Sequence, residues 1–314
     1  MLFRSEFVFD FAWEHAYHEH GLAYYPKLVA ATPFTPARGP RLLVRRDGDP
    51  AAIRTALAEA LNVVLEQGRW SSLHVQFATE EDLAALQPAG FMPRIDCQFL
   101  WQNRGYRDFD AFLATFSSEK RKKVLRERRR VREAGITHEW RHGSTLSEAE
   151  WQSVHGLLAG TFHRHGHEPY LPMDFFAAAS REQATEPRVL LARAGGHVVA
   201  AALFFQGRDT LYGRYWGSTE AHHSLHFETC YHQGVEYCIR EGVQRFEPGT
   251  QGEHKIARGF APTLTRSAHR IADPRFAAAI GRYLTAERAS IEDYATQAGS
   301  HVPFRRDLVL PAAD

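Results

Sequence analysis

Three strand-like segments followed by a helix constrain the fold of this chain more than any other feature of its sequence. Val189–Ala192 and Val198–Phe205 are rich in β-formers and are joined across Gly195-Gly196, which is a hairpin signal. Thr210–Trp216 is the third segment, and it precedes a predicted helix over His223–Arg240. Consecutive antiparallel strands that lead into a helix require a sheet with helices packed on it. The sequence therefore predicts an α/β (α+β) fold.

The N-terminal third of the chain also alternates between strand-like and helix-like segments. Ala51–Gln67 is an Ala- and Leu-rich helix, and Leu73–Phe77 alternates as a half-buried strand. Further strands are predicted at Phe7–Phe11 and Leu42–Val44. We divide the chain into two domains, residues 1–105 and residues 106–314, the second with a basic helix over 117–134 and a long C-terminal helix.

Composition limits the class of protein and its surroundings. The chain has 314 residues, 44% of them hydrophobic and 24% charged, which is typical of globular proteins. Its net charge of +1 gives no global attraction to nucleic acid or membrane. No apolar run approaches the ~20 residues of a spanning helix, and Met1–Ser5 has no signal-peptide character. Cys97, Cys230 and Cys238 are few and lie in apolar contexts, so we expect free thiols and a cytoplasmic protein.

The stretch Arg245–Phe260 concentrates more chemically active side chains than any other. It opens as a short strand, breaks at Pro248-Gly249, and then sets Gln, Glu, His, Lys and Arg among three glycines. Glycine allows a positive φ or a close approach of the backbone to a ligand. Functional residues tend to lie on irregular segments at strand ends. We therefore predict the rim of the active site here, although an ordinary polar turn is the alternative.

The segment 117–134 predicts a strongly basic helix with a thin apolar stripe. It begins at a serine cap and carries many more Lys and Arg than Glu. Charge runs are usually solvated surfaces, but this density favours contact with phosphate, because arginine matches phosphate geometry. The candidate phosphate-binding residues are Lys122, Arg126, Arg129 and Arg130.

Glu228 falls on the apolar stripe of the helix His223–Arg240, three residues after Leu225. A carboxylate on such a face is costly unless it meets a cation or works with a raised pKa. Arg214, Lys255 and Arg258 are the candidate partners. A structural salt bridge and a catalytic role are both compatible with this position.

Alternating histidines at His163, His165 and His167 are the only hint of a metal site in the sequence. No Cys or carboxylate cluster stands beside them at ligand spacing, so we predict a surface helix end and no metal.

Three motifs and the order of elements resemble a known family. Helices, three antiparallel strands, a helix and two more strands follow the order of the acyl-CoA N-acyltransferase (GNAT-like) fold. Ser117–Lys123, Leu225–Thr229 and especially Gln251–Phe260 resemble a bacterial family of N-acyltransferases described as FemAB-like, often labelled peptidoglycan-biosynthesis or GNAT proteins. The resemblance covers essentially the whole chain, and the last motif is specific.

The resemblance implies two tandem acyltransferase-fold domains. The first shows only the later half of that fold, so we expect it to be N-terminally incomplete and Met1 to be an internal start of a longer chain. In Fem-type enzymes an amino acid passes from aminoacyl-tRNA to an amine of a cell-wall precursor, whereas GNAT enzymes use CoA thioesters. The lead-in Gly217–His223 lacks the Gln/Arg-x-x-Gly-x-Gly/Ala turn that grips CoA. Acyl-CoA and aminoacyl-tRNA both stay open as donors, and no tightly bound cofactor is expected.

The predicted function is transfer of an acyl or aminoacyl group to a small or peptide-like amine. Amide formation needs a deprotonated amine and a stabilised oxyanion. The candidate catalytic residues are Glu228, Glu247 and His254. The candidate substrate-binding residues are Arg214, Tyr215, Gln251, Lys255 and Arg258. Replacing Lys255 or Arg258 is expected to cost little stability, because this reading places both on the surface.

A non-catalytic RNA- or anion-binding module on a degenerate transferase fold is the alternative. The basic helix and the missing CoA turn favour it, and tRNA is a possible partner in both interpretations. The mixture of acid, base and cations in Gln251–Phe260 favours the enzyme.

Overall fold

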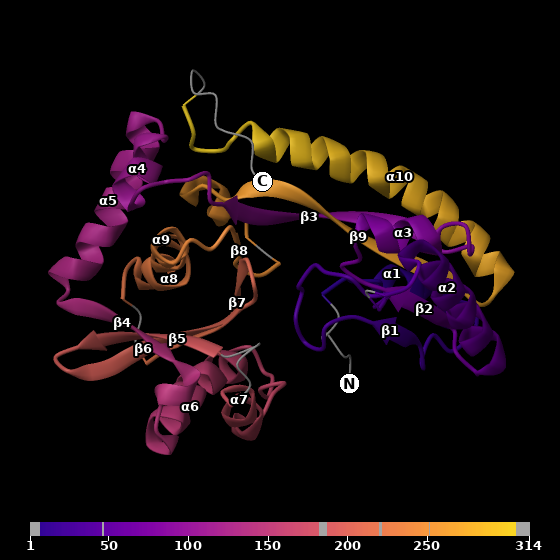
Figure 1. Cartoon of the computed structure of the whole chain (residues 1–314), viewed down its shortest axis with the longest axis horizontal. Coiled ribbons are helices and arrows are strands. Elements are labelled where there is room, and N and C mark those ends of the chain that lie inside the picture. The colour runs from indigo at the N-terminus through magenta and orange to yellow at the C-terminus, as the bar shows by residue number, and fades with distance from the viewer. Residues whose placement is uncertain (1–6, 46, 182–186, 220–221, 251, 306–314) are drawn as a thin grey trace. The chain divides into compact units, whose positions relative to one another are not determined.

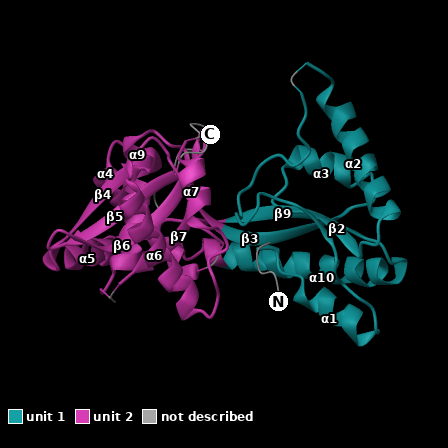
Figure 2. Cartoon of the chain, turned by 90° about the horizontal axis from the view of Figure 1, so that it is seen from below, with its two compact units in different colours: residues 1–98, 263–297 teal, residues 99–262, 298–314 magenta. Residues whose placement is uncertain are grey.

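The chain divides into two compact units, which Figure 2 colours separately. The structure is a computed structural model and describes residues 7–45, 47–181, 187–219, 222–250 and 252–305. Unit 1 comprises Met1–Gln98 with Thr263–Gln297, and unit 2 comprises Phe99–Pro262 with Ala298–Asp314. The sequence had instead assigned all of 106–314 to one domain. The assignment differs because the C-terminal strand pairs with a strand of unit 1.

Unit 1 holds the sheet order β1-β2-β9-β3, with helices on both faces (Figure 1). Its elements are α1 (Phe11–Glu19), β1 (Leu28–Ala30), α2 (Pro50–Gln67), β2 (Ser72–Val75), α3 (Glu80–Leu86), β3 (Met92–Gln102), β9 (Ala261–Ile271) and α10 (Pro274–Gly299). One core packs α2 and α3 on β2, and the other packs α1 and α10 around Ile271. Strands β3 and β9 each continue into unit 2.

Unit 2 continues the strand order as β3-β8-β7-β6-β5-β4. Its elements are α4 (Phe109–Ala114), α5 (Ser118–Glu133), β4 (Ile136–His142), α6 (Glu148–Arg164), α7 (Met173–Ala179), β5 (Pro187–Ala194), β6 (His197–Gln206), β7 (Thr210–Ser218), α8 (Leu225–Phe227), α9 (Gln233–Arg240) and β8 (Arg245–Glu247). Three short helices complete it: the 3₁₀-helices η1 (Gly143–Thr145) and η3 (Glu253–Arg258), and the π-helix η2 (Glu228–His232), which joins α8 to α9. The strands pair antiparallel except β7 and β8, which are parallel. This is the predicted GNAT-like order, and the α/β prediction is confirmed.

Helices cover both faces of the unit 2 sheet. Trp151, Val154 and Leu158 of α6, with Phe176 of α7, pack on β5 and β6 on one face. Val131 of α5 and Leu225 of α8 pack with Ala192 and Ala200 on the other. The predicted hairpin between β5 and β6 is also present, with Gly195 and Gly196 at φ 55° and 85°.

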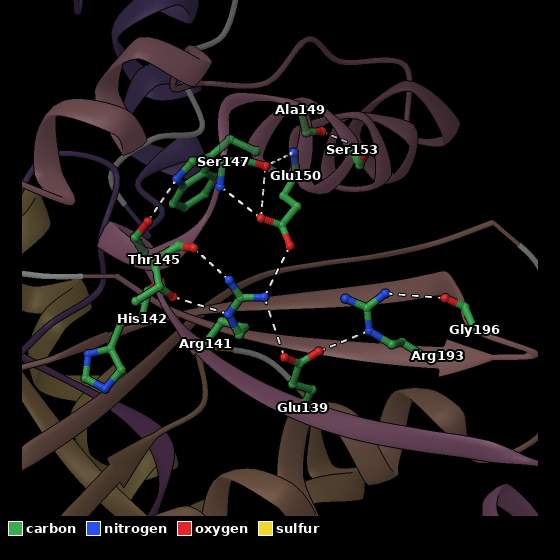
Figure 3. Close-up of polar contacts among 12 residues, drawn as sticks. Glu139, Arg141, His142, Thr145, Ser147, Ala149, Glu150, Ser153, Arg193 and Gly196 are labelled. Carbon is green, nitrogen blue, oxygen red and sulfur yellow. Dashed lines mark hydrogen bonds and ion pairs between the residues drawn. The ribbon is translucent and has the colours of Figure 1, made fainter.

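A polar network ties α6 to the edge strand β4, as Figure 3 shows. Arg141 Nη1 donates to Glu150 Oε1 at 3.2 Å and lies 3.5 Å from Glu139, which also pairs with Arg193 at 3.0 Å. Ser147 and Glu150 form a capping box at the start of α6. Side chains alternate along a strand, so His138 and Trp140 face the opposite side of the sheet from Glu139 and Arg141.

Two predicted strands are wrong and one strand was missed. Phe7–Phe11 runs into α1 rather than forming a strand, and Leu42–Val44 is irregular. The Asp82 carboxylate accepts hydrogen bonds from the backbone N–H groups of Arg41 and Leu42, so a side chain replaces a strand partner there. The missed strand is β4, whose polar sequence suits a sheet edge rather than a buried strand.

Candidate functional site

The pairing of the two parallel strands of unit 2 ends where β8 ends. β7 pairs with β8 only as far as Tyr212 opposite Glu247, after which β7 continues and β8 stops. The register between β6 and β7 shifts so that Arg214 is an extra residue, as in a β-bulge. Bulges and the carboxyl ends of parallel strands are favoured positions for active sites. We therefore expect active-site residues in the segment that follows β8.

That segment forms a 3₁₀-helix, η3 (Glu253–Arg258), between two glycines with positive φ. Gly252 has φ 111° and Gly259 has φ 90°, so the prediction of glycine-specific backbone conformations is confirmed. A Cβ on Gly259 would lie 2.6 Å from Phe112 Cζ, so no side chain fits there. The glycines thus let η3 pack tightly against the body of unit 2.

Lys255 is the central residue of η3, and it is only 1% exposed. Its Nζ donates to the carbonyl oxygen of Gly249 at 2.7 Å, directly after the strand end. Burial lowers the pKa of Lys255 to about 7, because the charged amine loses its hydration. The neighbouring Cys230 thiol has its pKa raised by burial, so it stays protonated at neutral pH. Lys255 is therefore an amine that exchanges its proton near neutral pH.

A buried ion pair holds η3 against α5. Arg258 Nη2 donates to Glu127 Oε1 at 2.6 Å, and His232 Nε2 lies 3.0 Å from the other carboxylate oxygen. Burial favours the neutral acid at Glu127, but the hydrogen bond from His232 and the charge of Arg258 outweigh it and lower its pKa. Arg258 also donates to the carbonyl oxygen of His254 and stacks 3.5 Å from the ring centroid of Phe227. These contacts fix the backbone beside Lys255.

His254 lies beside Lys255 among aromatic rings, and it is exposed. Its Nε2 is 2.8 Å from the hydroxyl of Tyr231, a residue of η2. The rings of Phe227 and His226 lie 5.6 Å and 6.2 Å away. Burial, with the positive charges nearby, lowers the pKa of His226 to about 4, so this imidazole is neutral at pH 7. Aromatic rings and a neutral imidazole thus surround the exposed His254, with the cations of η3 beside them.

The structure separates the candidate residues into groups. His254, Lys255 and Arg258 share η3, whereas Glu228 turns to a different set of partners. It is 4% exposed, and its Oε1 accepts from Arg128 Nε at 3.1 Å and from Gln233 at 2.8 Å. The cation beside Glu228 is therefore Arg128, not Arg214, Lys255 or Arg258. The roles assigned to these residues stay predictions.

The other candidates lie on or beside β7 and β8. Arg214 is partly buried, and its guanidinium lies 4.8 Å from the ring of Tyr215 and donates to its hydroxyl at 3.3 Å. Glu247, the last residue of β8, is partly buried. Gln251 lies outside the described residues.

The basic helix is observed as α5, close to the predicted bounds. Lys122, Arg126, Arg129 and Arg130 are all exposed, while Val124, Glu127 and Val131 are buried. Arg129 pairs with Glu133 at 3.5 Å, and Arg130 lies 3.3 Å from His223. The exposed cations are accessible to a phosphate-bearing partner, and that role stays a prediction.

The sequence argument missed Glu127, although a signal was present. Glu127 lies three residues after Val124 and four before Val131, on the same buried stripe of α5. The reasoning that drew attention to Glu228 applies equally to Glu127. Its partner Arg258 is 131 positions away, so no local pattern could identify the pair.

No helix in the described part of the chain is long and apolar enough to cross a bilayer. Within those same residues, no group of three or more His, Cys, Asp and Glu side chains could hold a metal ion. All three cysteines are free thiols.

The fold is shared with solved structures of other proteins. L-PGS from Bacillus licheniformis superimposes with a TM-score of 0.56 at 13% identity, covering 76% of this chain and 80% of that one. FemX gives a TM-score of 0.50 at 12% identity over 74% of this chain and 79% of that one. No curated protein matches the sequence. The chain belongs to the FemAB-like family, described by peptidoglycan biosynthesis/recognition, whose model matches residues 3–306.

Proposed function

We propose that this chain transfers an acyl or aminoacyl group to an amine, and that Lys255 accepts the proton of that amine. The proposal rests on a lysine that is 1% exposed and has its pKa lowered to about 7. General acid–base catalysis works best when the pKa lies near the operating pH. Membership of a family described by peptidoglycan biosynthesis/recognition supports the reaction class and a cell-wall precursor as acceptor.

The reaction follows from a neutral Lys255. Its amine takes a proton from the acceptor nitrogen as that nitrogen attacks the carbonyl carbon of the donor. A C–N bond forms, the C–O or C–S bond to the carrier breaks, and the Lys255 ammonium returns the proton to the leaving oxygen or sulfur. His254, exposed and hydrogen-bonded to Tyr231, is placed to contact substrate. Arg258 is a positioning residue, because its contacts hold the backbone of η3.

The donor is a carrier that bears phosphate groups, either aminoacyl-tRNA or acyl-CoA. The exposed cations of α5 support contact with such a carrier, because lysine and arginine neutralise phosphates. Neither donor is assigned as a tightly bound cofactor. The free cysteines fit the cytoplasm, where we expect the reaction to occur.

The test is amide formation detected by mass spectrometry, with each donor class offered to a panel of primary amines that includes cell-wall precursor peptides. We expect Lys255→Met to abolish the product. Lys255→Arg should abolish it too, because guanidinium stays protonated. Glu150→Gln, on the α6 surface, is the control and should retain full activity.

Two results would count against the proposal. A Lys255→Arg variant with wild-type rate would mean that position 255 supplies only a positive charge. Loss of product on Glu228→Gln or Glu247→Gln, with Lys255→Met still active, would move proton transfer to a carboxylate. If no donor gives product while RNA still binds α5, the non-catalytic alternative holds.

A further inference from the structure

Unit 2 contains a cavity that the proposed reaction does not use. Its volume is 770 Å³, within the range of small-molecule sites. The elements that line it, α4, α5, β4, η2 and α9, belong to unit 2, and all but η2 are labelled in Figure 1. Apolar walls come from Phe109, Leu125, Val131, Ile136 and Trp140. A ligand with an apolar body therefore fits this cavity.

Glu228 gives the cavity a buried acceptor. One carboxylate oxygen, Oε1, is engaged by Arg128 and Gln233. The other, Oε2, is buried and receives no hydrogen bond from any residue in the described part of the chain. Leaving a buried carboxylate oxygen without a donor is costly, so a donor on a bound ligand would be strongly favoured.

The charge around Glu228 favours a cation over an anion. Arg128 is shared between two carboxylates, since its Nη2 also donates to Glu236 Oε2 at 2.5 Å. The guanidinium of Arg128 is further committed to the ring of Phe109, 4.4 Å away. Two carboxylates against one arginine leave a local negative charge. This negative charge would repel a phosphate group, whereas an ammonium group would neutralise it.

Trp140 supplies the complementary donor. Its indole Nε1 is buried and has no hydrogen-bond acceptor among the residues that the structure describes. Trp140 lies between Glu139 and Arg141 on β4, so its side chain points to the opposite face of the sheet from theirs, and it lines the cavity. The cavity thus offers one unused acceptor and one unused donor. The lining also holds Arg132 and Arg240, and Asp108 and Asp110 offset their charge.

We propose that this cavity binds a primary ammonium group next to a carbonyl, as in an α-amino acid or a peptide N-terminus. The ammonium donates to Glu228 Oε2, the carbonyl oxygen accepts from Trp140 Nε1, and the side chain packs on the apolar walls. The site is separate from Lys255, although η2 carries residues of both. Binding at this site involves no chemical step, so it can be tested independently of the proposed reaction.

Isothermal titration calorimetry on the full chain tests the site with three related probes. L-phenylalaninamide represents a peptide N-terminus, L-phenylalanine represents a free amino acid, and N-acetyl-L-phenylalaninamide lacks the ammonium. We expect at least one amine to bind and the acetylated probe to bind at least tenfold more weakly, because a charged hydrogen bond is lost. Preference between the two amines then tells a free amino acid from an N-terminus.

Two variants assign the binding to this cavity. Glu228→Gln keeps the shape but removes the charge, and it should weaken amine binding at least tenfold. Trp140→Phe keeps an aromatic wall but removes the N–H donor, and it should weaken binding severalfold. The matched control Glu150→Gln should bind as wild type. Equal binding of the acetylated probe, an unchanged affinity in both cavity variants, or no binding of either amine would overturn the proposal.

Discussion

Replacing Lys255 by Met should stabilise the protein while it abolishes transfer. The buried amine must lose its hydration to carry a charge, and this is why its pKa lies at about 7 rather than 10.5. Methionine fills a similar volume and carries no charge. A residue kept at a cost to stability is expected at a working site.

The magnitude follows from the pKa. At about 1.4 kcal/mol for each tenfold change, lowering the pKa from 10.5 to about 7 corresponds to about 5 kcal/mol against folding at acidic pH. Loss of the hydrogen bond to Gly249 O offsets this by about 1–3 kcal/mol. The variant should therefore gain about 2–4 kcal/mol at about pH 6.

The pH dependence gives the sharper test. Between the folded and unfolded pKa values the unfolded state binds more protons at position 255, so the wild-type penalty is full below about pH 7 and fades as pH rises toward 10.5. The advantage of Lys255→Met should therefore shrink by about 2–3 kcal/mol from about pH 6 to about pH 9. Urea unfolding of both proteins at the two pH values measures it.

The control is Lys122→Met, since Lys122 is exposed on α5. This variant should show the same pH dependence of unfolding as the wild type. If Lys255→Met also follows the wild type in parallel at both pH values, the amine is hydrated in the folded protein, and the argument for a neutral lysine fails.

Two further predictions concern the surroundings of Lys255. Arg258→Ala should lower the free energy of unfolding by about 3–5 kcal/mol, because it leaves the Glu127 carboxylate buried without its cation; urea unfolding should show a much smaller loss when Glu127→Gln is already present, and additive losses would contradict the pairing. Changing Arg126, Arg129 and Arg130 together to Glu should weaken binding of tRNA or CoA and flatten its dependence on salt. Titrations at several salt concentrations measure this, and an unchanged slope would leave α5 as a solvated surface.

The burial of Lys255 and Arg258 corrects the sequence argument about their position. Both were expected on a surface loop, where substitution costs little stability, but they are 1% and 3% exposed. The glycines and charges singled out this segment, and its functional role stays a prediction. They could not show that the loop coils into a 3₁₀-helix and turns its cations inward. That orientation depends on Glu127, which is distant in sequence.

Local sequence patterns predicted the helices and strands well, but they predicted poorly which side chains contact each other. Helix α2 and the strands β5 to β7 follow from periodicity and turn signals, because those signals lie within a few residues. The π-helical turn in the helix after β7 could not be predicted from periodicity, because a π-helix changes which side chains share a face. This explains why Glu228 was expected near Lys255 and is instead bound to Arg128.

The π-helix separates the residues around Lys255 from those around Glu228. An ideal helix over 223–240 would keep Glu228 and Tyr231 on one stripe, three residues apart. In η2 the hydroxyl of Tyr231 meets His254 of η3, while the carboxylate of Glu228 meets Arg128 of α5. One turn of π-helix thus contacts both η3 and α5. π-Helical turns are rare and often occur at functional sites, so restoring regular helix by deleting one residue of η2 should disturb both sites together.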